Sequence, residues 1–154
     1  MKLLSFFEAW NSKNTIRNLI KSIHVQDKVK FEVSLTKAKE AGIIHDSAFI
    51  LLFLAGTEME DLFFLDSLLA APIDPKVSDE AGVPLIHFYV EMGRIEALER
   101  ILKCGANPNA RDTRGVTPLH VANSYDGLGD ISDLLLSFGA DPNLRDNIGK
   151  RYLM

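Results

Sequence analysis

Two stretches in the second half of the chain carry apolar residues at the spacing of one helix face. In the stretch 95–102 these residues fall at i, i+3, i+6 and i+7, and in the stretch 131–138 at i, i+3, i+4 and i+7. Both spacings match a helix with one buried side. Gly105 and Gly139 follow, and a glycine with positive φ can end a helix without a Cβ clash. The apolar residues are Ile95, Leu98, Ile101, Leu102, Ile131, Leu134, Leu135 and Phe138.

A second helix signal precedes the stretch 131–138. Thr117 can cap a helix by accepting hydrogen bonds from its first backbone amides, and Pro118 suits the next position because its missing N–H would be unpaired there. The Pro-Asn pairs 108–109 and 142–143 predict an extended exit from the preceding helices, and the Asn and Asp residues near Gly115 and Gly149 suit a turn. The predicted unit is therefore helix, turn, helix and hairpin.

These signals recur along the chain. The phrase Gly-Val-Thr-Pro-Leu-His at 115–120 has a weaker copy, Gly-Val-Pro-Leu-Ile-His, at 82–87, which is an offset of 33 (115 minus 82). The phrase Gly-Ala-Asp-Pro-Asn at 139–143 follows Gly-Ala-Asn-Pro-Asn at 105–109 with an offset of 34 (139 minus 105). The longer offset reflects an insertion in the turn 123–127, where added length costs little.

A repeat of this length with a Thr-Pro-Leu-His phrase resembles the ankyrin-repeat family. The resemblance implies an all-α solenoid of helix-turn-helix units with projecting hairpins, built for binding other proteins. It covers the units 79–111 and 112–145 clearly, and a partial unit follows at 146–154. Carrying the register back by one more repeat length gives a degenerate unit at 46–78, which keeps the apolar positions and lacks the phrases.

Residues 1–45 do not match the repeat but have helical features. Asn14 is a candidate cap for one helix, and Asp27 for a second that ends at Gly42. The second segment also alternates like a strand over 29–35, and the neighbouring helical stack favours the helix. Two clear repeats rarely hold a stack alone, so we interpret residues 1–45 as an N-terminal helical cap on the repeats 46–154, within one continuous domain.

Composition agrees with one globular domain without a membrane segment. Hydrophobic residues make up 47% of the 154 residues and charged residues 25%. The longest apolar run, 48–55, is far too short to cross a bilayer. The single cysteine, Cys104, fits a reducing compartment, so we expect a cytoplasmic protein.

Charge is unevenly distributed. Residues 1–45 hold 8 Lys and Arg against 4 Asp and Glu, a net +4, whereas residues 46–154 hold 9 against 17, a net −8. Acidic repeats disfavour nucleic acid, which requires a basic face, and favour a basic protein partner. The alternative that the acidic residues only keep the repeats soluble stays open.

Catalytic chemistry has little support in the sequence. His87 and His120 occupy the same place in their repeats, which the family resemblance makes a buried structural position; Pro84 replaces the supporting threonine in the first. Cys104 ends a helix, where the dipole disfavours a thiolate. We therefore expect no enzyme, cofactor, metal or small-molecule substrate. His24 and His45 lack a Cys, His or carboxylate at the spacing of metal ligands, and the acidic cluster Glu58, Glu60 and Asp61 is typical of a solvated turn. Gly127 to Gly129 lack the preceding strand and the downstream spacing of a phosphate-binding loop.

The predicted function is protein binding. A small repeat stack without a catalytic domain suits a masking inhibitor or a toxin-neutralising immunity protein, and the alternative is an adaptor or secreted effector that binds a second partner through residues 1–45. Ankyrin proteins bind through hairpin tips and the exposed side of each first helix. Carried onto this chain, those positions are Glu80, Ala81, Val83, Glu91, Met92, Thr113, Arg114, Val116, Ser124, Tyr125, Asn147 and Ile148, supported by the structural residues Gly105, Thr117, Pro118, His87, His120 and Gly139.

Overall fold

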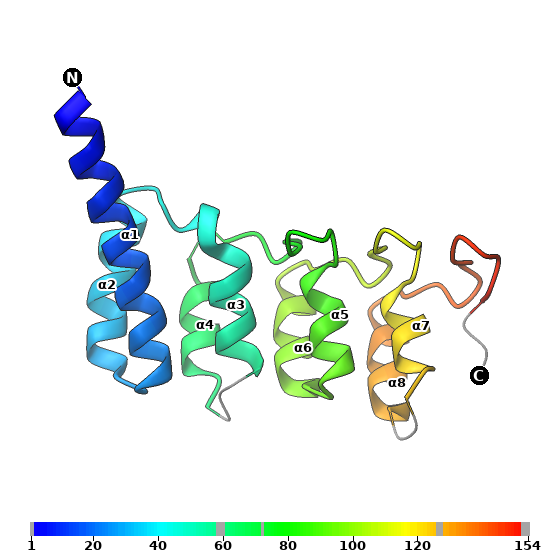
Figure 1. Ribbon diagram of the computed structural model, residues 1–154. Coiled ribbons are helices and arrows are strands. Elements are labelled where there is room, and N and C mark those ends of the chain that lie inside the picture. Colours follow the sequence, from blue (N-terminus) through cyan, green and yellow to red (C-terminus); the bar gives the residue numbers. More distant parts are fainter. Residues whose placement is uncertain (1, 58–60, 72, 126–127, 152–154) are drawn as a thin grey trace. The chain divides into compact units, whose positions relative to one another are not determined.

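The computed structural model describes residues 2–57, 61–71, 73–125 and 128–151, with side chains from Ser12 onward. Within these ranges the chain is helical, which confirms the predicted fold class (Figure 1). Its contacts divide it into two compact units, residues 1–74 and 75–154. The helices are α1 (Lys2–His24), α2 (Lys28–Glu40), the short 3-10 helix η1 (His45–Ser47), α3 (Ala48–Thr57), α4 (Phe63–Leu69), α5 (Leu85–Glu91), α6 (Ile95–Lys103), α7 (Pro118–Ala122) and α8 (Gly129–Ser137).

The first unit consists of two helix pairs. Helix α1 packs against α2, and α3 packs against α4; α1 also contacts α3, and α2 contacts α4. The rings of Phe31 and Phe64 meet edge to face with centroids 5.0 Å apart, which joins α2 to α4. Lys28 of α2 also forms an ion pair with Asp61. The N-terminal helices therefore bury their apolar sides against the degenerate unit.

The segment 28–40 is a helix and not a strand. Asp27 caps it by accepting a hydrogen bond from the Lys30 amide at 3.0 Å. Phe31, Leu35 and Ala38 are fully or almost fully buried. Their spacing of four and three residues is that of a helix face and not the alternation of a strand. Gly42, just beyond the helix, has a φ of +66°.

The predicted start of the first helix at Asn14 is wrong. Helix α1 begins at Lys2, so Asn14 lies inside it and is exposed. Asparagine is a common helix cap because its side chain can bond nearby backbone amides. Inside a helix it is less favourable than alanine by less than about 1 kcal/mol, so an asparagine does not have to mark a helix start. Apolar residues farther along α1, such as Leu19 and Ile23, are completely buried and outweigh that cost.

The second unit contains two helix pairs with the same arrangement. Helix α5 packs against α6 and α7 against α8, while α5 also contacts α7 and α6 contacts α8 (Figure 1). Gly105 after α6 and Gly139 after α8 have φ of +94° and +87°. The fully buried residues of this core include Leu85, Tyr89, Val90, Leu98, Ile101 and Leu135. The division into a cap over 1–45 and repeats over 46–154 stays a prediction.

Candidate protein-binding surface of the repeats

Each hairpin of the second unit turns around an aspartate. Asp79, Asp112 and Asp146 each accept two backbone hydrogen bonds on Oδ1, from the amides two and four residues later, at 2.8–3.1 Å. The backbone amide of each aspartate also donates to the carbonyl four residues on. Such Asx turns hold the loop without a neighbouring strand. The hairpins are therefore locally rigid platforms for the residues at their tips.

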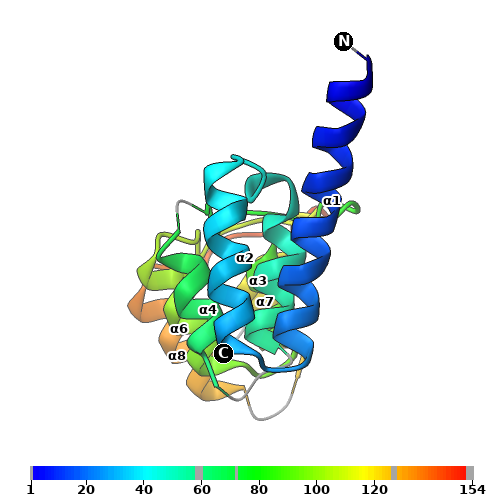
Figure 2. The same ribbon diagram turned by 90° about the vertical axis from the view of Figure 1, so that its left-hand side faces the viewer.

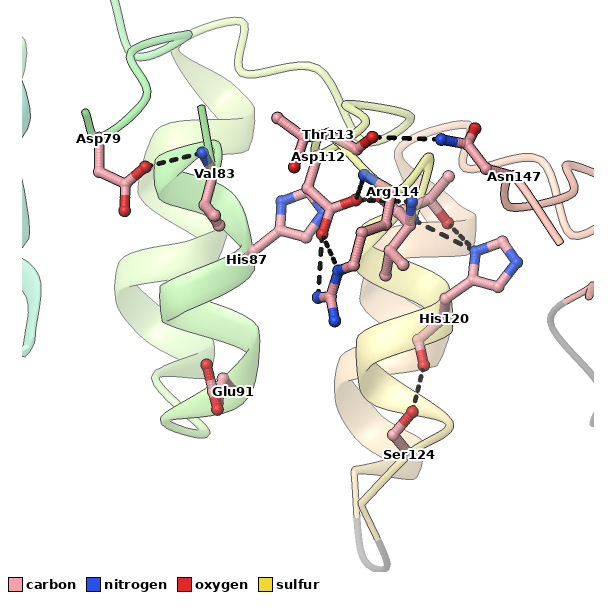
Figure 3. Close-up of polar contacts among 12 residues, drawn as sticks. Asp79, Val83, His87, Glu91, Asp112, Thr113, Arg114, His120, Ser124 and Asn147 are labelled. Atoms are coloured by element: carbon pink, nitrogen blue, oxygen red, sulfur yellow. Dashed lines mark hydrogen bonds and ion pairs between the residues drawn. The ribbon is translucent and has the colours of Figure 1, made fainter. Parts of the chain in front are cut away.

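Asp112 is the most buried of these aspartates. Its side chain is 2% exposed, while Arg114, which forms an ion pair with it at 3.0 Å, is 78% exposed. Burial alone would raise the pKa of Asp112, but hydrogen bonds from Val116 and Arg114 outweigh it, so the pKa lies below the ordinary value. Arg114 is thus tied at its guanidinium and presents its remaining surface to solvent (Figure 3).

His120 connects its repeat to the next hairpin. Its Nδ1 accepts from the Thr117 hydroxyl at 2.7 Å and from the Thr117 amide at 3.2 Å. Its Nε2 donates to the Lys150 carbonyl at 2.9 Å, because a carbonyl oxygen can only accept. Both ring nitrogens of His120 are therefore occupied by hydrogen bonds within the scaffold.

His87 occupies the same place one repeat earlier but is only half satisfied. Its Nε2 donates to the Val116 carbonyl at 2.9 Å, whereas its buried Nδ1 has no partner among the described residues. Pro84 stands where Thr117 stands in the next repeat and offers neither a hydroxyl nor an N–H. Burial lowers the pKa of His87, so the ring is neutral near pH 7.

The predicted partner-binding residues fall at two ends of α5 and α7. Figure 3 shows Glu91 and Ser124 near one end of these helices and Thr113, Arg114 and Asn147 in the hairpins at the other. With a rise of about 1.5 Å per residue, a seven-residue helix such as α5 separates the ends by about 10 Å. The hairpin group is Glu80, Ala81, Val83, Thr113, Arg114, Val116, Asn147 and Ile148, and the helix-end group is Glu91, Met92, Ser124 and Tyr125.

Glu80 therefore does not lie beside Tyr125 and Met92. Glu80 lies in the Asp79 turn, before α5, whereas Met92 directly follows the last residue of that helix. The sequence positions of these residues within the repeat did not predict their separation, because the chain runs back and forth between the two ends of a helix-turn-helix unit. A partner must extend along α5 and α7 to reach both groups.

The helix-end group is joined across the repeats. The Tyr125 hydroxyl donates to Glu91 Oε1 at 2.7 Å, from a residue 34 positions later. The Glu91 carboxylate raises the pKa of Tyr125 through this hydrogen bond. Tyr125 and Met92 remain 45% and 50% exposed, which is unusual for side chains of their size. We call Glu91, Met92 and Tyr125 the helix-end patch.

Asn147 and Val116 of the hairpin group also link one repeat to another. Asn147 donates from its amide group to the Thr113 carbonyl at 3.1 Å and from its backbone to the Arg114 carbonyl at 2.9 Å. A Cβ on the neighbouring Gly115 would collide with the Asn147 side chain. Val116 contributes its carbonyl to His87. Ile148, by contrast, is 88% exposed at the last tip.

The remaining chemical candidates are only partly covered by the structure. Glu58, Glu60 and Gly127 lie outside the described residues, and Asp61 is paired with Lys28. Across 2–57, 61–71, 73–125 and 128–151, no three His, Cys, Asp or Glu side chains are grouped to hold a metal ion. None of the helices in those ranges combines the length and the apolar composition of a membrane span.

Residues 52–146 match the family model of ankyrin repeats, with three copies. This match covers more than half of the chain. The chain belongs to the ankyrin-repeat family. Ankyrin repeats bind proteins, so the chain is a protein-binding module of a generally non-catalytic family.

Several known ankyrin proteins are similar to parts of the chain. Human protein phosphatase 1 regulatory subunit 27 is 39% identical over 69 residues, which are 45% of this chain and 44% of that protein. An ankyrin repeat and LEM domain-containing protein 1 homolog of Caenorhabditis elegans is 45% identical over 56 residues, 36% of this chain and 8% of that protein. Drosophila Notch is 34% identical over 76 residues, 49% of this chain and 3% of that protein. The chain thus spans less than half the length of each of these relatives.

The sequence indicated turn residues near Gly115 and Gly149, but not that one repeated aspartate organises each hairpin or that Asn109 links two repeats. The aspartates that organise the hairpins recur at offsets of 33 (112 minus 79) and 34 (146 minus 112), so their spacing was visible. Asn109 also bridges two repeats, since it accepts from the Asp141 amide at 2.7 Å and donates to the Gly139 carbonyl at 3.0 Å. Its place in the repeated Pro-Asn pair was the available signal.

Proposed function

We propose that this chain is a masking protein that covers a functional surface of a basic protein partner, as an inhibitor or an immunity-type protein does. The partner lies along the exposed side of α5 and α7, between the hairpin tips and the helix-end patch. Protein binding is a property of the whole family, whereas this location of the partner is inferred from the exposed residues of the second unit. The human relative is a phosphatase regulatory subunit, which supports a role for this chain in controlling another protein.

The helix-end patch is the observation that carries the proposal. Tyrosine and methionine are enriched at the centres of interfaces, because they bury much area with little polar desolvation. The hydrogen bond from Tyr125 to Glu91 holds the ring in one place before binding, which reduces the entropy lost on association. A pre-positioned aromatic side chain with an apolar neighbour is a suitable anchor for a partner.

Acidic residues beside this surface favour a basic partner. Glu80 in the first hairpin and Glu91 in the helix-end patch are both exposed. Rim charges of this kind mainly accelerate encounter, whereas buried anchors slow dissociation. We therefore expect Glu80→Lys with Glu91→Lys to lower the association rate and its salt dependence, and Glu91→Lys also to free the Tyr125 ring because it removes the acceptor of the tyrosine hydroxyl. Tyr125→Ala should weaken binding by about 2 kcal/mol, or roughly thirtyfold.

Site-specific crosslinking tests the proposal. A photoreactive amino acid is placed at Met92 or Ser124 in the full chain, and at Ser137 of α8 as an exposed control away from α5 and α7. The two patch positions should capture the same protein from the native source, and the control should not. The captured protein is then purified and measured against Tyr125→Ala and the double glutamate variant. Unchanged affinity and rate for all of these variants would refute the repeat-face site.

The adaptor is the second candidate, and one observation favours it. Val25, Val29 and Val33 are exposed in the N-terminal segment, where a cap that only covered the repeats would have no need of an outward apolar stripe. In either role we propose a cytoplasmic location, which suits Cys104, an exposed free thiol.

A further inference from the structure

A groove of about 360 Å³ runs between α1 and α2, remote in sequence from the repeat surface proposed above. Figure 2 looks onto these two helices from the side away from α3 and α4. The groove is lined by three valines, two lysines and three small polar residues. They are Asn18, Lys21, Ser22, Val25, Val29, Lys30, Val33 and Ser34.

The valines form an exposed apolar stripe along this groove. Val25, Val29 and Val33 are 59%, 76% and 52% exposed, and successive members are four residues apart. Val29 and Val33 lie on one side of α2, because residues four apart neighbour one another on a helix. Phe31 and Leu35, two residues on from each, are buried on the other side. Helix α2 therefore has an apolar stripe on its outer side as well as its core side.

The charged side chains around the stripe are mainly basic. Lys21 and Lys30 line the groove, and Lys37 lies one helical turn beyond Val33 and is exposed. Asp27 caps α2 and forms an ion pair with Lys30 at 2.8 Å, so these two charges offset one another and the excess basic charge along the stripe is that of Lys21 and Lys37. With the net charge of +4 over residues 1–45, the groove attracts negative charge.

We propose that this groove docks an acidic amphipathic helix of a partner protein. A groove between two helices accepts the side-chain ridge of a third, and aliphatic residues at i and i+4 of the docked helix match the spacing of the valines. Its Asp and Glu residues lie beside Lys21 and Lys37. A second copy of this chain fits less well, because the same groove would bring another set of lysines against these. The site gives the adaptor role its second partner and is independent of the repeat-face site.

Peptide binding to the full chain tests the groove. The probe is a fluorescein-labelled helical peptide with leucine on one face, glutamate beside it and alanine elsewhere; its twin has lysine in place of glutamate. Fluorescence anisotropy should show binding of the glutamate peptide and affinity at least about tenfold lower for the lysine twin. Tyr125→Ala should leave this binding unchanged, which separates this site from the repeat face.

Matched variants locate the binding on the chain. Lys21→Glu should weaken binding of the glutamate peptide about tenfold, whereas Lys39→Glu, an identical charge change at an exposed position outside the groove, should have little effect. Val29→Ser with Val33→Ser should abolish binding, and circular dichroism checks that the chain remains folded, as expected for exposed positions.

Four results would overturn the proposal. The first is equal affinity of the chain for the two peptides, and the second is an equal effect of Lys21→Glu and Lys39→Glu on binding of the glutamate peptide. The third is that the chain binds phosphatidylserine vesicles but not the peptide, and that the double valine variant loses the vesicle binding. The fourth is a concentration-dependent dimer in sedimentation that the valine variant dissociates, which would assign the groove to a second copy.

Discussion

Replacing Pro84 by threonine should stabilise the protein by completing the hydrogen bonds of His87. In the wild type the buried Nδ1 of His87 has no partner among the described residues. One repeat later the Thr117 hydroxyl and amide both donate to the corresponding nitrogen of His120, at 2.7 and 3.2 Å. The two backbones are similar, since Pro84 has φ −63° and ψ 143° and Thr117 has φ −101° and ψ 165°. Threonine can therefore adopt the conformation of Pro84 without strain.

The expected gain follows from three contributions. A completed hydrogen bond contributes about 0.5–1.5 kcal/mol, and relief of a buried unpaired acceptor contributes on the order of 1 kcal/mol more. Losing proline makes the unfolded chain more flexible, which costs about 0.4–1 kcal/mol. The net effect is a stabilisation of about 1 kcal/mol, or a rise in the midpoint of thermal unfolding of roughly 2–4 °C for a chain of this size.

Urea unfolding followed by circular dichroism measures this difference. Pro84→Val is the matched control, because valine has the shape of threonine and restores the N–H but has no hydroxyl. Threonine should exceed valine by about 1 kcal/mol, the contribution of a single hydrogen bond from the hydroxyl. If the two variants were equally stable, the hydroxyl would not reach His87 and the reasoning from Thr117 would fail.

Three further predictions concern the same scaffold. Gly139→Val should cost about 1–3 kcal/mol in urea unfolding, because φ at Gly139 is +87°, a conformation that is strained for valine, while an added Cβ itself meets no atom within 4 Å. A cost below that of Gly129→Val would contradict this reasoning. Removing residues 1–45 should expose Phe64 and Leu52, and light scattering should show aggregation, whereas a soluble monomer that melts cooperatively would remove the cap interpretation. Burial lowers the pKa of His87 below 6.5, so on acidification His87 takes up a proton in the unfolded chain before it does so in the folded protein. The free energy of unfolding should therefore fall as the pH drops from 6.5 towards the pKa of folded His87. His87→Gln should reduce this pH dependence, and an unchanged slope would assign it to another group.

Helices that carry a strong apolar period were predictable, and helix starts were less so. The stretch 95–102 became α6, and the Asp27 cap of α2 was correct, because local chemistry and packing agree there. Asn14 carried a valid cap signal that longer-range burial of Leu19 and Ile23 overruled. A cap signal in one sequence only shows where a helix is able to begin.

The candidate surface was predictable in its residue types and not in its geometry. Exposure of Met92 and Tyr125 follows from their place in the repeat, but the bond between Tyr125 and Glu91 joins side chains from successive repeats and depends on how α5 and α7 pack. The groove between α1 and α2 likewise needs two helices at a particular rotation. The family resemblance did not cover this segment, so nothing in the repeat register placed its valines outward.

The hydrogen bonds from each histidine to the following hairpin make the stack directional. The Nε2 of His87 bonds to the Val116 carbonyl and the Nε2 of His120 to the Lys150 carbonyl, so in each case the partner is a residue that comes later in the chain. A protease cut between Asp146 and Lys150 would consequently loosen α7, although no residue of that helix is touched. A repeat added after residue 151 has to keep the backbone position of Lys150, so that its carbonyl still meets His120. An insertion before Asp79 leaves both histidine contacts intact.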